Sequence, residues 1–108
     1  MEEREHYYLI GLLAVSGIGN AHAKGLIDYF GSASHVFHAK SSELKEVPGI
    51  SEKIIKNILD RHGLKASDEI MTQCQKNEIA LISYCSKKYP DRLRGLYNGP
   101  ALLYYKGS

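Results

Sequence analysis

The chain has 108 residues, of which 44% are apolar and 24% charged, a composition typical of a soluble globular domain with a single core. No apolar run approaches the roughly 20 residues that a membrane span requires, and the acidic start of the chain argues against a secretory signal, so we expect a cytoplasmic protein without membrane contact. The net charge of +2 is low for a nucleic-acid-binding protein, and all of it lies in residues 66–108, because residues 1–65 carry eight basic and eight acidic residues.

The N-terminal part reads as helices separated by glycine-containing turns. An apolar helix over residues 6–14 leads into a turn at residues 15–19. Asn20 is predicted to cap a second helix that continues to Phe30, and Gly31 to end it.

The same pattern continues through the next forty residues. Two short helices are expected before a second turn at residues 47–51, and the helix after that turn is expected to end at Gly63. One more helix is predicted over residues 67–77. The serines predicted as N-caps are Ser32, Ser41 or Ser42, and Ser51.

The last third of the chain has a different character. The short apolar segment 79–83 predicts a buried strand, and residues 100–105 predict a second one. Tyr89-Pro90 interrupts the segment between them, which also contains a short helix. We therefore expect a division into residues 1–65 and residues 66–108.

The two turns form an internal repeat. Val15-Ser16-Gly17-Ile18-Gly19 and Val47-Pro48-Gly49-Ile50-Ser51 align at an offset of 32 residues, each between two predicted helices. The first glycine permits a tight turn, and the isoleucine fills the core beneath it. This is the pattern of a helix-hairpin-helix motif. We therefore expect a mainly α fold, a tandem helix-hairpin-helix (SAM-like) bundle followed by a helix and a short two-stranded β appendage.

Such a hairpin has a definite chemistry. The last small residue opens the following helix, whose free N–H groups and dipole favour a phosphate oxygen. The hairpin thus grips a nucleic-acid backbone without reading bases, and two copies would grip both strands of a duplex. The predicted DNA-binding residues are Gly17, Ile18, Gly19, Asn20, His22, Lys24, Gly49, Ser51, Lys53, Lys56, Lys87, Lys88 and Arg92. Hairpin 1 (residues 15–19) is favoured, because Glu46 and Glu52 flank hairpin 2 (residues 47–51).

The order of motifs resembles the DNA-processing protein A (DprA/Smf) family. The segments that carry the resemblance are Gly17-Ile18-Gly19, Phe30-Gly31-Ser32-Ala33, Val47-Pro48-Gly49-Ile50, Tyr89-Pro90, and Pro100-Ala101-Leu102-Leu103-Tyr104-Tyr105-Lys106-Gly107. The resemblance implies a part in natural transformation and recombination, with single-stranded DNA and the RecA recombinase as partners of the full-length protein. It also implies that residues 66–108 form a linking helix and the leading edge of a Rossmann-like domain that is absent from this chain.

Two other functions compete with this interpretation. In a helix-hairpin-helix glycosylase Lys53 would be the nucleophile, but the expected aspartate position holds Met71, and the chain is too short for a base-flipping pocket. We therefore expect no enzymatic activity and no cofactor. A SAM-like protein-interaction module remains open, since residues 1–65 carry no net charge.

Overall fold

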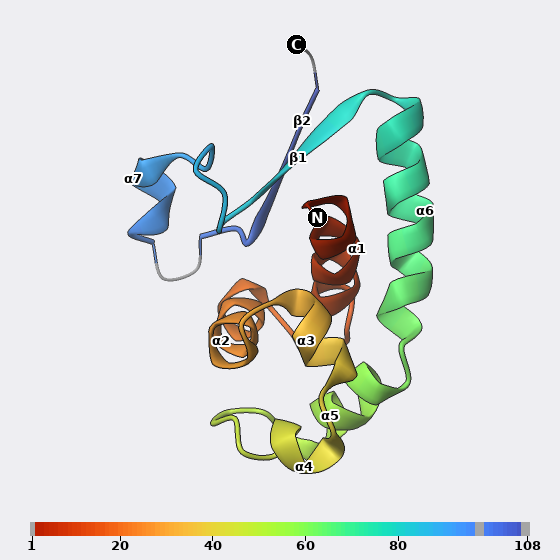
Figure 1. Cartoon of the computed structure of the whole chain (residues 1–108), viewed down its shortest axis with the longest axis vertical. Coiled ribbons are helices and arrows are strands. Elements are labelled where there is room, and N and C mark those ends of the chain that lie inside the picture. Colours follow the sequence, from red (N-terminus) through yellow and green to blue (C-terminus); the bar gives the residue numbers. More distant parts are fainter. Residues whose placement is uncertain (1, 97–98, 107–108) are drawn as a thin grey trace.

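The computed structural model describes residues 2–96 and 99–106, and it is mainly helical, as predicted (Figure 1). Gly107, with which the resemblance to the DprA family ended, lies outside the described residues. The elements, in chain order, are α1 (Glu2–Leu13), α2 (Asn20–Phe30), α3 (Ala33–His38), α4 (Ser41–Leu44), α5 (Glu52–Leu59), α6 (His62–Lys76), β1 (Ile79–Ser83), α7 (Asp91–Arg94) and β2 (Leu102–Lys106).

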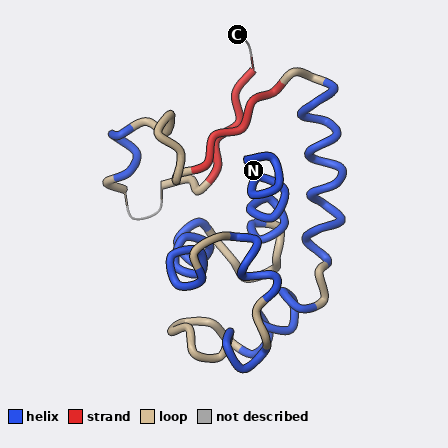
Figure 2. The backbone as a smooth tube through the Cα atoms, viewed as in Figure 1, coloured by secondary structure: helices blue, strands red, loops and turns tan. Residues whose placement is uncertain are grey.

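Helix α1 lies at the centre of the molecule. Figure 2 shows α6 running along one side of α1, with α2 and α3 on the other side and the two strands across one end. The core is formed by apolar side chains of the first five helices, of the two hairpin turns and of the start of β2. Its fully buried members include Leu12, Leu26, Val36, Leu44 and Ile58. Burial of this apolar surface is what holds the short helices α3 to α5 in place, because helices of this length are not stable alone.

Glycine allows α1 and α6 to approach closely. A Cβ atom on Gly63 would overlap the backbone carbonyl of Gly11. One turn further along α6, the buried Ser67 donates a hydrogen bond of 2.6 Å to the Tyr7 carbonyl oxygen. The prediction that Gly63 ends a helix is therefore wrong: this glycine lies inside α6, which begins five residues earlier than the predicted residue 67.

The strands form the predicted two-stranded appendage. β1 and β2 are antiparallel, with Leu81 opposite Tyr104 in the register. Between them, the buried Tyr89 donates a 2.6 Å hydrogen bond to the Pro100 carbonyl oxygen. We call residues 79–96 and 99–106 the appendage. The division of the chain at residue 65 stays a prediction, and that position lies within α6.

Two of the four predicted helix caps are confirmed. The hydroxyl oxygens of Ser32 and Ser51 each accept a backbone N–H from the first turn of α3 and α5. The serine cap predicted for α4 is wrong, because Lys40 is the N-cap residue and its N–H donates to the Glu43 carboxylate. The cap predicted for Asn20 is also wrong, since Gly19 occupies the N-cap of α2.

No helix within residues 2–96 and 99–106 combines the length and the hydropathy that crossing a lipid bilayer would require.

Candidate nucleic-acid interface

Hairpin 1 has the geometry that the repeat predicted. Gly17 has a φ of +94°, a conformation that favours glycine, and the N–H of Ile18 closes the turn by donating to the Val15 carbonyl oxygen at 3.1 Å. The Ile18 side chain is buried in the core. Gly19 is exposed, with nothing within 4 Å of an added Cβ.

The start of α2 is open. The Gly19 N-cap provides no side-chain hydrogen bond, and the first turn of α2 contains no acidic residue. An α-helix leaves its first N–H groups without intrahelical partners, and these groups carry the positive end of the dipole. The start of α2 therefore has neither a side-chain cap nor an acidic residue that would disfavour an anion.

Hairpin 2 repeats the turn but not the open helix start. Gly49 has a φ of +84°, and Ile50 is half-buried against the core. The Ser51 hydroxyl oxygen accepts the Ile54 N–H at 3.3 Å, so one of the free amides of α5 already has a partner. Glu52 adds a negative charge in the same turn, which disfavours a phosphate there.

Each turn packs against the second helix of the other hairpin. Asn57 of α5 donates to the Ser16 carbonyl oxygen at 3.3 Å, and a Cβ on Gly17 would lie 3.0 Å from Ile54. Reciprocally, a depression of about 260 Å³ lies between α2 and hairpin 2, lined by residues that include His22 and Gly49. Each turn therefore lies beside the helix that follows the other turn.

Two predicted contact residues of α2 are engaged by the appendage. The Asn20 Oδ1 atom accepts the Ala101 N–H at 3.0 Å. The Lys24 ammonium lies 5.5 Å from the centre of the Tyr84 ring, and the Tyr84 hydroxyl donates to the Asp28 carboxylate at 3.2 Å. Burial is the main cause that raises the pKa of Tyr84 above its ordinary value, followed by the nearby Cys85 and Asp28.

The other predicted basic residues are exposed at two places. Lys53 and Lys56 lie on α5, whereas Lys87, Lys88 and Arg92 lie on the appendage, between the two strands. The structure thus does not gather all the predicted residues into one cluster. Contact of any of these side chains with DNA stays a prediction.

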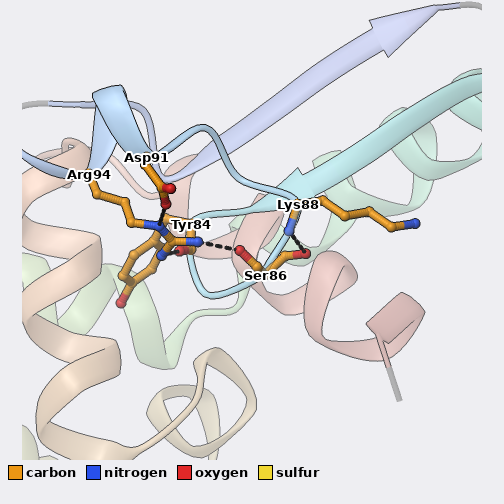
Figure 3. Close-up of polar contacts among 5 residues, drawn as sticks. All are labelled: Tyr84, Ser86, Lys88, Asp91 and Arg94. Carbon is orange, nitrogen blue, oxygen red and sulfur yellow. Dashed lines mark hydrogen bonds and ion pairs between the residues drawn. The ribbon is translucent and has the colours of Figure 1, made fainter.

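Arg94 is a structural residue that the predicted site did not include (Figure 3). Its guanidinium donates to the carbonyl oxygens of Tyr84 at 2.8 Å and Ser86 at 2.5 Å, and it pairs with the Asp91 carboxylate at 3.3 Å. It also lies 5.4 Å from the centre of the Tyr89 ring. In the sequence, Arg94 follows Lys87, Lys88 and Arg92, and this basic stretch does not indicate carbonyl partners eight and ten residues before Arg94.

Paired glycine turns, with Ile18 buried and Ile50 half-buried beneath them, define a tandem helix-hairpin-helix domain. The chain belongs to the SAM-like helix-hairpin-helix tandem family, whose sequence model matches residues 9–62, half of the 108 residues.

The chain is also similar to curated proteins named UvrABC system protein C. That of Wolbachia pipientis wMel is 36% identical over 59 residues, which are 54% of this chain and 10% of the relative. That of Hahella chejuensis (strain KCTC 2396) is 47% identical over 45 residues, 42% of this chain and 7% of the relative. The chain thus spans a tenth or less of the length of these relatives. No solved structure matches it. The comparisons support the tandem hairpins and do not single out the DprA family.

Proposed function

We propose that this chain binds the sugar–phosphate backbone of DNA through hairpin 1, without reading bases and without catalysing a reaction. The observation that carries the proposal is the uncapped start of α2 beneath the exposed Gly19. A phosphate oxygen there would accept hydrogen bonds from the free N–H groups of the first turn. It would also lie at the positive end of the helix dipole. Contacts of this kind are independent of sequence.

Hairpin 2 is the weaker contact in this proposal. Its serine cap and Glu52 both reduce the attraction for a phosphate, whereas its turn lies beside α2 and continues the same surface. The two hairpins would therefore bind the two strands of a duplex unequally.

The resemblance to the DprA family suggests the setting in which this binding would be used. We propose a part in DNA processing in the cytoplasm, during natural transformation or recombination, with single-stranded DNA and the RecA recombinase bound by a longer protein. The order of strand, Tyr89-Pro90 and second strand supports this setting. The similarity to UvrABC system protein C is compatible with DNA binding by the hairpins and adds nothing to the choice of setting.

A protein-interaction module is the second candidate. The observation in its favour is the absence of net charge in residues 1–65, which hold both hairpins. Since the affinity of phosphate contacts comes largely from released counterions, a neutral surface limits how strongly this domain can hold DNA.

Titration with single- and double-stranded DNA at several salt concentrations tests the proposal. We expect weak binding that falls as salt rises, with amide NMR shifts at Gly19, Asn20 and Ala21. The absence of binding at low salt, or shifts confined to other elements, would refute the proposal and favour the interaction module.

A further inference from the structure

The segment of residues 84–96, which we call the basic segment, concentrates the positive charge of the chain. It holds Lys87, Lys88, Arg92 and Arg94 against Asp91, a net charge of +3, whereas the whole chain carries +2. The side chains of Lys87, Lys88 and Arg92 are exposed. These exposed charges therefore attract a polyanion.

Arg94 does not contribute to that attraction in the way its neighbours do. Its guanidinium already bonds to two carbonyl oxygens and one carboxylate, and it lies over an aromatic ring. These three bonds use three of the five N–H donors of the guanidinium, so Arg94 has fewer donors left for a phosphate than an unengaged arginine. Its ion pair with Asp91 also leaves Lys87, Lys88 and Arg92 as the uncompensated charges.

The bonds of Arg94 determine where the two lysines lie. The carbonyls that it holds belong to Tyr84 and Ser86, and the next two residues are Lys87 and Lys88. The N–H of Lys88 donates to the Ser86 hydroxyl at 3.2 Å, and the Lys88 side chain extends away from the Arg94 cluster (Figure 3). The turn that carries both ammonium groups is thus fixed, while the groups themselves are exposed.

The basic segment is also fixed relative to hairpin 1. The Tyr84 hydroxyl bonds to Asp28 of α2, and a depression of about 500 Å³ separates α2 from the segment. That depression and the one beside hairpin 2 share Ala21 and Gly25 as lining residues. Hairpin 2, α2 and the Tyr84–Arg94 part of the basic segment therefore lie along one side of the molecule. Lys88 lines a separate depression of about 520 Å³, together with Gly31 and Ser32 at the other end of α2.

We propose that Arg94 is a positioning residue that preforms a second phosphate-contact surface, formed by Lys87 and Lys88, for the DNA that hairpin 1 binds. The inference rests on the proposed function and extends it to a longer stretch of backbone. A preformed turn reduces the entropic cost of binding, because the segment does not have to be ordered when DNA binds. Lysine cannot replace Arg94, because one ammonium does not match the forked donors that bridge two carbonyls and a carboxylate.

The test compares salt-dependent binding of a 20-base-pair duplex by the wild type and four variants. Lys87→Gln/Lys88→Gln removes the proposed contacts. Lys65→Gln/Lys76→Gln is the matched control, since both lysines are exposed on α6, on the far side of the molecule from α7 (Figure 1). Arg94→Lys keeps the charge and loses the geometry, and the triple variant combines Arg94→Lys with Lys87→Gln/Lys88→Gln.

We expect Lys87→Gln/Lys88→Gln to lower the magnitude of the salt slope by about 1.8 and to weaken binding at 0.1 M salt by tens-fold, at about 8-fold for each lost contact. The α6 control should keep the wild-type slope. Arg94→Lys should weaken binding several-fold in the wild-type background and have no further effect in the triple variant, because Arg94 acts through the two lysines. Circular dichroism and thermal unfolding would establish that each variant is folded.

Four outcomes would overturn the inference. If Lys87→Gln/Lys88→Gln behaves like the α6 control, the second surface does not exist, while the function of hairpin 1 stands. If Arg94→Lys binds like the wild type, or weakens binding equally in both backgrounds, Arg94 does not position the lysines. Wild-type protein without salt-dependent binding overturns the proposed function together with this inference.

Discussion

Gly11 and Gly63 face each other where α1 crosses α6, so closely that a Cβ on Gly63 would overlap the Gly11 carbonyl. Gly63→Ala should therefore push the two helices apart. We expect a loss of about 1–3 kcal/mol in the free energy of unfolding, despite the higher helix propensity of alanine. Urea unfolding followed by circular dichroism measures this change, and an unchanged or higher midpoint would contradict the close contact.

Gly25 provides the opposite case within the same chain. It is exposed in the middle of α2, and an added Cβ would meet nothing within 4 Å. Gly25→Ala should stabilise the protein by about 0.5–1 kcal/mol, because alanine loses less backbone entropy in a helix. The same urea experiment measures it. A destabilised variant would mean that α2 is not helical at this position.

Exchanging the N-cap residues Gly19 of α2 and Ser51 of α5 tests whether the missing cap makes hairpin 1 the stronger DNA contact. Gly19→Ser should cap α2 as Ser51 caps α5, which raises stability by a few tenths of a kcal/mol and weakens DNA binding, because the hydroxyl takes an amide that a phosphate would use. Ser51→Gly should have the reverse effects on hairpin 2. Fluorescence anisotropy with labelled duplex measures the affinities. Tighter binding by Gly19→Ser would show that free amides are not the contact.

Asn20 links the start of hairpin 1 to the appendage. Asn20→Ala removes the acceptor of the Ala101 N–H. With a net value of about 1 kcal/mol for one hydrogen bond, the exchange of that amide should become roughly 5-fold faster. NMR hydrogen exchange measures it. Asn57→Ala, which removes the bond to the Ser16 carbonyl within the hairpins, is the control and should leave Ala101 unaffected.

The raised pKa of Tyr84 predicts that the folded protein loses stability in alkaline solution. Its pKa is raised in the folded protein, mainly by burial, above the ordinary value of about 10. The folded chain therefore holds this proton where the unfolded chain releases it. The contribution is fully present below pH 10 and is lost as the pH rises further. Urea unfolding between pH 8 and 11.5 should show a steeper decline for the wild type than for Tyr84→Phe, and parallel curves would contradict the shift.

Local signals made much of the fold predictable. Glycines on both sides define α2, which ends at Phe30 as predicted and begins one residue earlier than predicted, and the apolar run 79–83 matches β1. The prediction failed at Gly63, where a glycine that permits close helix packing has the same appearance in sequence as one that ends a helix. A turn through Arg61, at a φ of 59°, ends α5 instead, and arginine carries no sequence signal for that conformation.

The candidate site was predictable only where it depends on neighbours in sequence. The turn glycines, the buried Ile18 and the serine cap at Ser51 follow from the repeat and are present. The partner of Asn20 lies 81 residues away, and no local pattern indicates such a contact. Arg94 was similarly indistinguishable from exposed basic residues such as Arg92, because its partners are backbone carbonyls.

The bond between Asn20 and Ala101 also has a consequence for the order of events during translation. At about 5–20 residues per second, a ribosome needs roughly 4–16 s to add the 81 residues that separate these two partners. Throughout that interval the Asn20 side chain lacks its Ala101 partner. The bond can therefore form only after Ala101 has been added, so slowing translation lengthens the time before the appendage can dock.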